Sequence, residues 1–228
     1  MTTPRTLRSR RIATGWFACM LASTLFAAAP KMRLYTIDLP NHVLRFSLPE
    51  EIAQQIQPFQ IEAQFVPTDS TYVKDGFRSI VRKYYQFQGP FWVGAYGALR
   101  FEFTVVRREK EIPGKVTTSD ELESYIPRWI EKYHEVGYGY GRAELSGAPW
   151  VLRQKNTFGR VAEGAEEMQG FSCPIDETMF FDVGFWITET VPGSAAKWKP
   201  QAEAFREAIK ATIVLQPKSP AATNASRL

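Results

Sequence analysis

The chain has 228 residues, of which 44% are hydrophobic and 14% are aromatic. This length suffices for one domain with a sizeable core, and the aromatic content excludes a largely disordered chain. The formal net charge is +4, but residues 1–29 contain four Arg and no acidic residue, which leaves 24 basic and 24 acidic residues in the rest. The body therefore has no net charge, and its composition gives no indication of nucleic-acid binding.

Residues 1–30 have the pattern of a targeting segment. Four arginines between positions 5 and 11 precede an uncharged, mostly apolar run at 12–29, and Ala27-Ala28-Ala29 has the small side chains of a cleavage site. Pro30 opposes cleavage there, and a run of about 18 residues is near the lower limit for spanning a bilayer. We favour a cleaved signal peptide and keep a retained membrane anchor as the alternative. Both predict a periplasmic body.

The first half of the body predicts mostly strands, because apolar and polar side chains alternate between turn residues. Ser47-Leu48-Pro49-Glu50 has the spacing of a helix start. The expected elements, in order, are strands at 31–39 and 42–48, a short helix at 51–56, a strand at 59–65, a loop at 67–77, and strands at 80–87 and 91–107.

A charged loop at 107–116 leads to a predicted amphipathic helix. Thr118-Ser119-Asp120-Glu121 is a capping box, and apolar residues then recur every three or four positions as far as Val136. Pro127 lies inside this pattern, so we expect a kink or a lost hydrogen bond there. Gly137 is a suitable helix end.

The strongest pattern lies at 168–190, where large apolar residues occupy every second position of a predicted strand. One face of that strand carries Met179, Phe181, Val183, Phe185 and Ile187. Pro174 to Glu177 is turn-like, so residues 168–173 are expected to pair back as a hairpin. We predict that this hairpin is the centre of an antiparallel sheet.

The remaining segments complete an α+β domain at 31–216. They predict a strand pair at 138–146 and 150–158, a last helix starting at Pro200, a short strand at 213–215 and a disordered tail at 217–228. Hairpins dominate, and strands do not alternate strictly with helices. The predicted fold class is therefore a single domain with an antiparallel sheet and helices packed against it.

Few residues in the sequence suggest catalysis or metal binding. The two histidines, His42 and His134, have no ligand partner at metal-binding spacing, and Cys173 is the only cysteine of the body. No G-x-S-x-G motif occurs, although a Ser–His–acid arrangement stays open because its members need not be close in sequence. We expect no catalytic, metal or cofactor site.

Two segments are candidates for partner binding. The tyrosines within Gly137 to Gly141 follow a helix rather than a strand, which opposes a phosphate-binding loop. They suit either a flexible entry to a strand or a recognition loop. The charged hairpin end that begins at Arg107 is the second segment. The residues expected to contact a partner are Tyr138, Tyr140, Arg142, Arg107, Arg108 and Glu109.

The C-terminal third resembles a known group of domains. The pattern consists of a G-x-P-W strand (Gly147, Pro149, Trp150), the hairpin sequence FSCPIDETMFFDVGF and a last helix with Phe205, Ile209 and Ile213. It resembles the PsbP/DcrB-like α/β/α sandwich group, in element order over 33–216 and in sequence pattern over 145–215. The group includes chaperones and immunity-like proteins of type VI secretion systems. The resemblance implies a non-enzymatic domain that binds other proteins and supplies no catalytic residues.

Three functions are consistent with these observations. The favoured one is an exported protein-binding domain of the bacterial cell envelope, including an immunity or inhibitor protein against a secreted toxin. The second is an envelope accessory or assembly factor, attached to the membrane only through an uncleaved N-terminal segment. The third is a hydrolase with an unrecognised site, which would require a cleft that gathers a histidine and acids.

Overall fold

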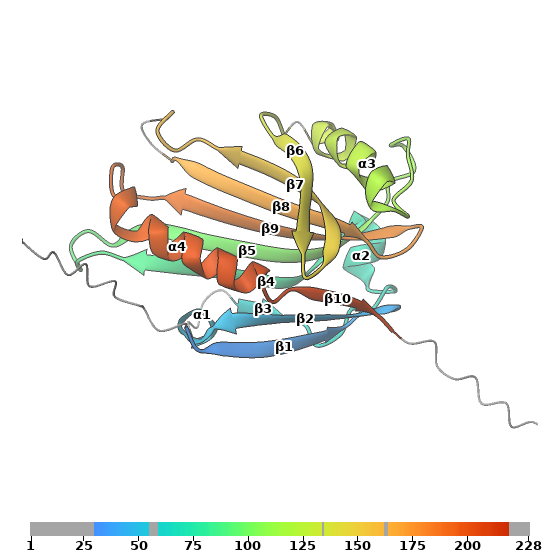
Figure 1. Ribbon diagram of the computed structural model, residues 1–228, viewed down its shortest axis with the longest axis horizontal. Coiled ribbons are helices and arrows are strands. Elements are labelled where there is room, and N and C mark those ends of the chain that lie inside the picture. Colours follow the sequence, from blue (N-terminus) through green and yellow to red (C-terminus); the bar gives the residue numbers. More distant parts are fainter. Residues whose placement is uncertain (1–29, 55–58, 134, 162–163, 219–228) are drawn as a thin grey trace, which may run out of the picture.

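Two antiparallel sheets and four helices make up the part of the chain that the structure describes (Figure 1). The structure is a computed structural model, and it describes residues 30–54, 59–133, 135–161 and 164–218. The predicted α+β fold class is thus confirmed. The predicted targeting segment, His134 and most of the predicted tail lie outside the described residues.

The smaller sheet joins the two ends of the described chain. It consists of β1 (Met32–Asp38), β2 (His42–Pro49) and β10 (Val214–Pro217), with β2 in the middle. Both predicted N-terminal strands are therefore present, and the short strand predicted at 213–215 pairs with β2.

The larger sheet has seven strands in the order β3-β4-β5-β9-β8-β7-β6. The strand β9 is the central strand of this sheet and pairs with β5 on one side and with β8 on the other. The strands are β3 (Phe59–Ile61), β4 (Phe77–Gln88), β5 (Ala95–Arg107), β6 (Gly139–Leu145), β7 (Ala148–Asn156), β8 (Glu166–Pro174) and β9 (Met179–Glu189).

Helices cover both faces of the larger sheet. On one face, α4 (Ala195–Lys210) packs against β5, β9 and the smaller sheet. On the opposite face, α3 (Ser119–Lys132) packs against β6, β7 and β8 (Figure 1). Two short helices, α1 (Glu50–Gln54) and α2 (Ser70–Asp75), lie in the connections before β3 and β4.

The predicted core hairpin is confirmed. The five alternating residues of β9, from Met179 to Ile187, are all buried in one cluster with α4 and the smaller sheet. The other face of β9 is buried as well, because α3 and the loop before it cover Phe180. Burial on both faces explains why Asp182, which alternates with the apolar residues, is only 6% exposed.

Several predicted boundaries are wrong. The loop predicted at 67–77 contains α2, which Asp69 caps through hydrogen bonds from the backbone N–H groups of Thr71 and Tyr72. The strand predicted at 59–65 is regular only at β3, and beyond it Gln64 makes a single isolated bridge with Asp38. The strand predicted at 91–107 begins at Ala95, because residues 89–94 form the turn of the β4–β5 hairpin.

The last helix also begins earlier than its predicted start at Pro200. The Glu189 carboxylate accepts a hydrogen bond from the Ala195 backbone N–H (3.0 Å), and the Trp198 indole donates to Ser194 Oγ (3.1 Å). These contacts hold the first helical turn before Pro200. They therefore compensate for the backbone hydrogen bond that Pro200 cannot donate inside the helix.

Candidate functional site

A cleft lies between the C-terminal half of α3 and the larger sheet, and we call it the α3 cleft. It encloses about 230 Å³ and its lining is mainly apolar. The strand β4 contributes Phe77, the strand β5 contributes Val106, and α3 contributes Trp129 and Ile130. The full lining is Asp75, Gly76, Phe77, Thr104, Val106, Arg107, Glu109, Trp129, Ile130, Tyr133, Glu135 and Asp182.

The capping box predicted for α3 is present and fixes the start of this helix. Thr118 Oγ1 accepts a hydrogen bond from the Glu121 backbone N–H (3.2 Å), and the Glu121 carboxylate accepts from the Thr118 N–H (3.3 Å). The preceding loop is tied to the helix, because the Glu109 N–H donates to the Tyr125 hydroxyl (2.9 Å) and Arg128 donates to the Pro113 carbonyl (2.7 Å). The α3 cleft therefore has a firmly held wall.

The rim of the α3 cleft carries charges of both signs. Burial alone would raise the pKa of Glu109, but hydrogen bonds from Lys132 and Tyr133 lower it below the ordinary value. Glu109 is therefore ionised at neutral pH. On the other side, Arg107 donates to the Val73 carbonyl of α2 (3.2 Å) and lies near the Tyr72 ring.

A buried ion pair lies at the floor. Arg153 donates to both carboxylate oxygens of Asp182, at 2.5 and 2.8 Å, and the Ser172 hydroxyl donates to the same carboxylate (2.5 Å). Burial opposes the charge of Arg153, but the adjacent Asp182 raises the pKa of the guanidinium above its ordinary value. Because the Asp182 carboxylate accepts three hydrogen bonds, it is a structural anchor rather than an available base.

The structure brings some of the predicted partner residues to this cleft and turns others away. Arg107 and Glu109 line it. Tyr138 reaches it indirectly, because its hydroxyl donates to Glu135 (2.9 Å), which lines the cleft. Burial and this hydrogen bond raise the pKa of Tyr138.

The remaining three predicted residues do not line the cleft. Tyr140 is 40% exposed on β6, opposite Arg153 in the strand register. Arg142 forms ion pairs with Asp120 and Glu123 on α3 (both 2.7 Å), and Arg108 donates to the Gly114 carbonyl within its own loop. Arg142 and Arg108 therefore hold α3 and its loop in place.

Sequence reasoning missed the apolar residues that surround the cleft opening. Phe77 and Tyr133 line the cleft and are 45% and 52% exposed, although both are large aromatic residues. Phe77 belonged to a predicted loop, and Tyr133 was assigned to the buried stripe of a helix. The only local signal was Gly76 followed by Phe77, because a glycine commonly ends a helix. In the structure Gly76 does end α2, at φ +76°, and the exposed Phe77 begins β4.

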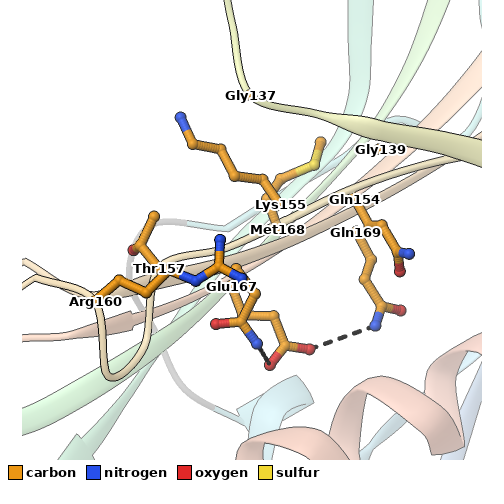
Figure 2. A pocket seen from close by; sticks show the side chains of 10 residues that line it. Gly137, Gly139, Gln154, Lys155, Thr157, Arg160, Glu167, Met168 and Gln169 are labelled. Atoms are coloured by element: carbon orange, nitrogen blue, oxygen red, sulfur yellow. Dashed lines mark hydrogen bonds between the residues drawn. The ribbon is translucent and has the colours of Figure 1, made fainter.

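A second, more polar hollow of about 530 Å³ lies beside the start of β6 (Figure 2). Lys155 extends toward Gly137, and Arg160 reaches in from the β7–β8 connection. The carboxylate in this hollow, Glu167, pairs with Lys199 (2.8 Å) and with Arg206 of α4. Among the described residues that line this hollow there is neither a histidine nor a cysteine.

His42 and Cys173 line a third hollow, of about 320 Å³. Burial raises the pKa of the Cys173 thiol well above its ordinary value, so the reactive thiolate is disfavoured. Burial also lowers the pKa of His42. Among the described residues, no three His, Cys, Asp or Glu side chains gather closely enough to hold a metal ion.

Comparisons with known proteins add no relative from which a site could be carried over. No protein-family model matches the chain, and no curated protein matches its sequence. Within the described ranges, no helix is both long and apolar enough to cross a membrane.

Proposed function

We propose that this chain is a non-enzymatic, protein-binding domain of the bacterial cell envelope that receives its partner at the α3 cleft. The observation that carries the proposal is the pair of exposed aromatic side chains, Phe77 and Tyr133, that line an apolar cleft with a charged rim. Exposed apolar groups gathered at one place on a folded surface are typical of interaction sites.

The size of the cleft favours a protein over a small molecule. Small-molecule pockets typically enclose about 300–1,000 Å³ and bury most of the ligand. The α3 cleft encloses about 230 Å³ and is open. That volume suits one or two projecting side chains of a partner protein, which is how a few anchor residues supply most of the affinity of an interface.

The composition of the rim suits the same kind of partner. Protein interfaces are enriched in aromatic residues and arginine at their centre and are polar at the rim. Phe77, Trp129 and Tyr133 supply the aromatic centre, and Arg107 and Glu109 supply charges of both signs. We therefore infer a partner with an apolar anchor flanked by both an acidic and a basic group.

A secreted toxin is the partner class that we favour, which makes the chain an immunity or inhibitor protein. The resemblance to the PsbP/DcrB-like group, which includes immunity-like proteins, supports this identification, as does the predicted export of the body. A hydrolase is less favoured, because the Asp182 carboxylate is held by Arg153 and Ser172 and the Cys173 thiol is kept protonated.

Site-specific photo-crosslinking in cells that make the full chain tests the proposal. A benzophenone amino acid at position 77 or 133 should give one and the same protein adduct. The same group at Leu34 of β1, which is 65% exposed, is the matched control and should give none. The adduct should also be lost when Val106→Asp places a charge in the cleft, provided that the variant keeps its unfolding midpoint. Equal adducts at positions 34, 77 and 133 would rule out the α3 cleft as the binding site.

A further inference from the structure

The turn of the β4–β5 hairpin, residues 89–94, carries the two most exposed aromatic side chains that the structure describes. Phe91 is 93% exposed and Trp92 is 73% exposed, and their rings contact each other at 5.0 Å between centroids. We call residues 89–94 the aromatic tip. Around it, positions 84–99 contain no charged residue.

The aromatic tip is held in one conformation. The Val93 N–H donates to the Pro90 carbonyl (2.8 Å), which places Phe91 and Trp92 at the two central positions of a β-turn. The Gly89 N–H donates to the Gly94 carbonyl (2.7 Å) just below. Two large aromatic groups are thus presented to solvent on a preorganised turn, which reduces the entropy cost of docking.

The base of the hairpin is also fixed to the body. The Tyr96 carbonyl accepts hydrogen bonds from the backbone N–H groups of Thr190 and Val191 and from the Ser194 hydroxyl. Lys197 of α4 lies over the Tyr96 ring at 4.9 Å, which puts a cation beside the uncharged hairpin end. An apolar end next to a cation is the arrangement that enters the interface of an anionic bilayer.

The chain reaches the body from this same end. The Glu50 N–H donates to the Lys31 carbonyl (2.8 Å), and the pKa of Tyr85 of β4 is raised first by burial and then by the nearby Glu51 carboxylate. Figure 1 shows the start of β1, α1 and the β4–β5 turn at the left-hand end of the molecule. Lys31, near the start of the described residues, therefore lies at the end of the body that carries the aromatic tip.

From these observations we infer that the aromatic tip docks onto a lipid bilayer, with Phe91 and Trp92 in its interfacial region. Tryptophan and other aromatic side chains favour that region because they are apolar and can still hydrogen-bond at one end. This inference is independent of the α3 cleft. Phe77 and Gln88 are at opposite ends of β4, roughly 36 Å apart at the rise of an extended strand.

Fluorescence quenching by brominated lipids tests the inference on the full chain. The protein would be reconstituted into phosphatidylcholine vesicles that contain phosphatidylglycerol and carry bromine on the upper acyl chain. The difference in emission between the unsubstituted chain and the Trp92→Phe variant is the Trp92 component. The brominated lipids should quench at least half of this component. The same subtraction with Trp186→Phe, a half-buried residue in the middle of the sheet, should show little quenching.

A charge in the turn provides a second, independent variant. Phe91→Asp should lower the ratio of docked to undocked protein about tenfold, because burying one large apolar side chain changes an equilibrium constant by about that factor. Val136→Asp is the matched control, since Val136 is equally apolar and 73% exposed but lies in the α3–β6 connection. If the Trp92 component is not quenched, the inference is wrong. A protein adduct formed by a crosslinker at position 92, together with an unquenched Trp92, would show that the aromatic tip binds a protein instead.

Discussion

At the scale of single residues, buried charges on the two faces of the larger sheet decide how the molecule tolerates change. Arg153 and Asp182 form an ion pair with each other beneath α3, and Glu167 forms ion pairs with Lys199 and Arg206 beneath α4. A buried charge that loses its partner costs far more than an exposed one, because nothing replaces the lost solvation. The same substitution should therefore have different effects at buried and exposed ion pairs.

We expect Asp182→Ala to lower the free energy of unfolding by about 3–5 kcal/mol, because it leaves Arg153 charged and buried. Chemical denaturation measures the change. Asp120→Ala removes a partner of the exposed Arg142 and is the matched control, whose unfolding midpoint should match that of the unsubstituted chain. The double change Arg153→Met with Asp182→Leu should restore much of the loss. Equal midpoints for Asp182→Ala and Asp120→Ala would contradict a structural role for the buried pair.

The pH dependence of stability should contain a contribution from Glu167. Burial alone would raise the pKa of Glu167, but hydrogen bonds from Lys199 and Arg206 lower it below its ordinary value of 4.5. The ionised form therefore stabilises the folded state above the unfolded pKa, and this stabilisation is lost as the pH falls through the folded pKa. Glu167→Gln should be less stable than the unsubstituted chain at pH 7, and the difference should shrink toward pH 3. A difference that stays constant with pH would refute this.

At the scale of elements, packing determined several boundaries that local sequence could not. The start of α4 depends on Trp198, which packs directly over Gly97 of β5. These residues are a hundred positions apart, so a proline was the only local signal for the start of the helix. In contrast, α3 has its capping box within the sequence and begins within one residue of the predicted position.

Gly97→Ala should loosen the first turn of α4. A Cβ at Gly97 would lie 2.2 Å from the Trp198 ring, so the ring would have to move. We expect a loss of about 1–3 kcal/mol, as for other overpacked cores. Faster amide hydrogen exchange at residues 195–199 would locate the change. Gly141→Ala is the control, because a Cβ there has no neighbour within 4 Å, and it should leave exchange in α4 unaltered.

Alternation located the long central strands well but made the strand predicted at 59–65 too long, and apolar turns were mistaken for strand. The pattern from Met179 to Ile187 fixed both the position and the inward face of β9. In contrast, Phe91 to Gly94 was predicted as strand because it is apolar, although Pro90 and Gly94 close a turn there. An apolar residue is buried only where another element packs over it, and the hydrophobic pattern of the sequence does not show which residues another element covers.

At the scale of the whole molecule, the candidate site could be predicted only in part. Arg107 and Glu109 were selected for their position at a charged hairpin end, and they do line the α3 cleft. The rest of the lining comes from α2, β4, β5, α3, the residues just after α3 and β9, most of which are far apart in sequence. Only the tertiary fold brings Phe77, Trp129 and Asp182 together, so no local pattern could have shown a cleft there.

The two proposed surfaces lie at opposite ends of β4 and do not compete. With the aromatic tip on a bilayer, the α3 cleft would lie at the far end of β4 from the membrane. The chain should therefore bind its partner and lipid at the same time. In the crosslinking experiment, Phe91→Asp should leave the adduct at position 133 unchanged. A loss of that adduct would show that the two surfaces depend on each other.

The pairing of β10 with β2 places a requirement on biosynthesis. The smaller sheet is complete only when Val214 to Pro217 meet the strand that contains Leu44, and Thr212 Oγ1 then accepts a hydrogen bond from the Ser47 N–H (2.8 Å). Nearly the entire polypeptide must thus be synthesised before the native topology can close. Such distant contacts slow folding, so the smaller sheet is expected to form late.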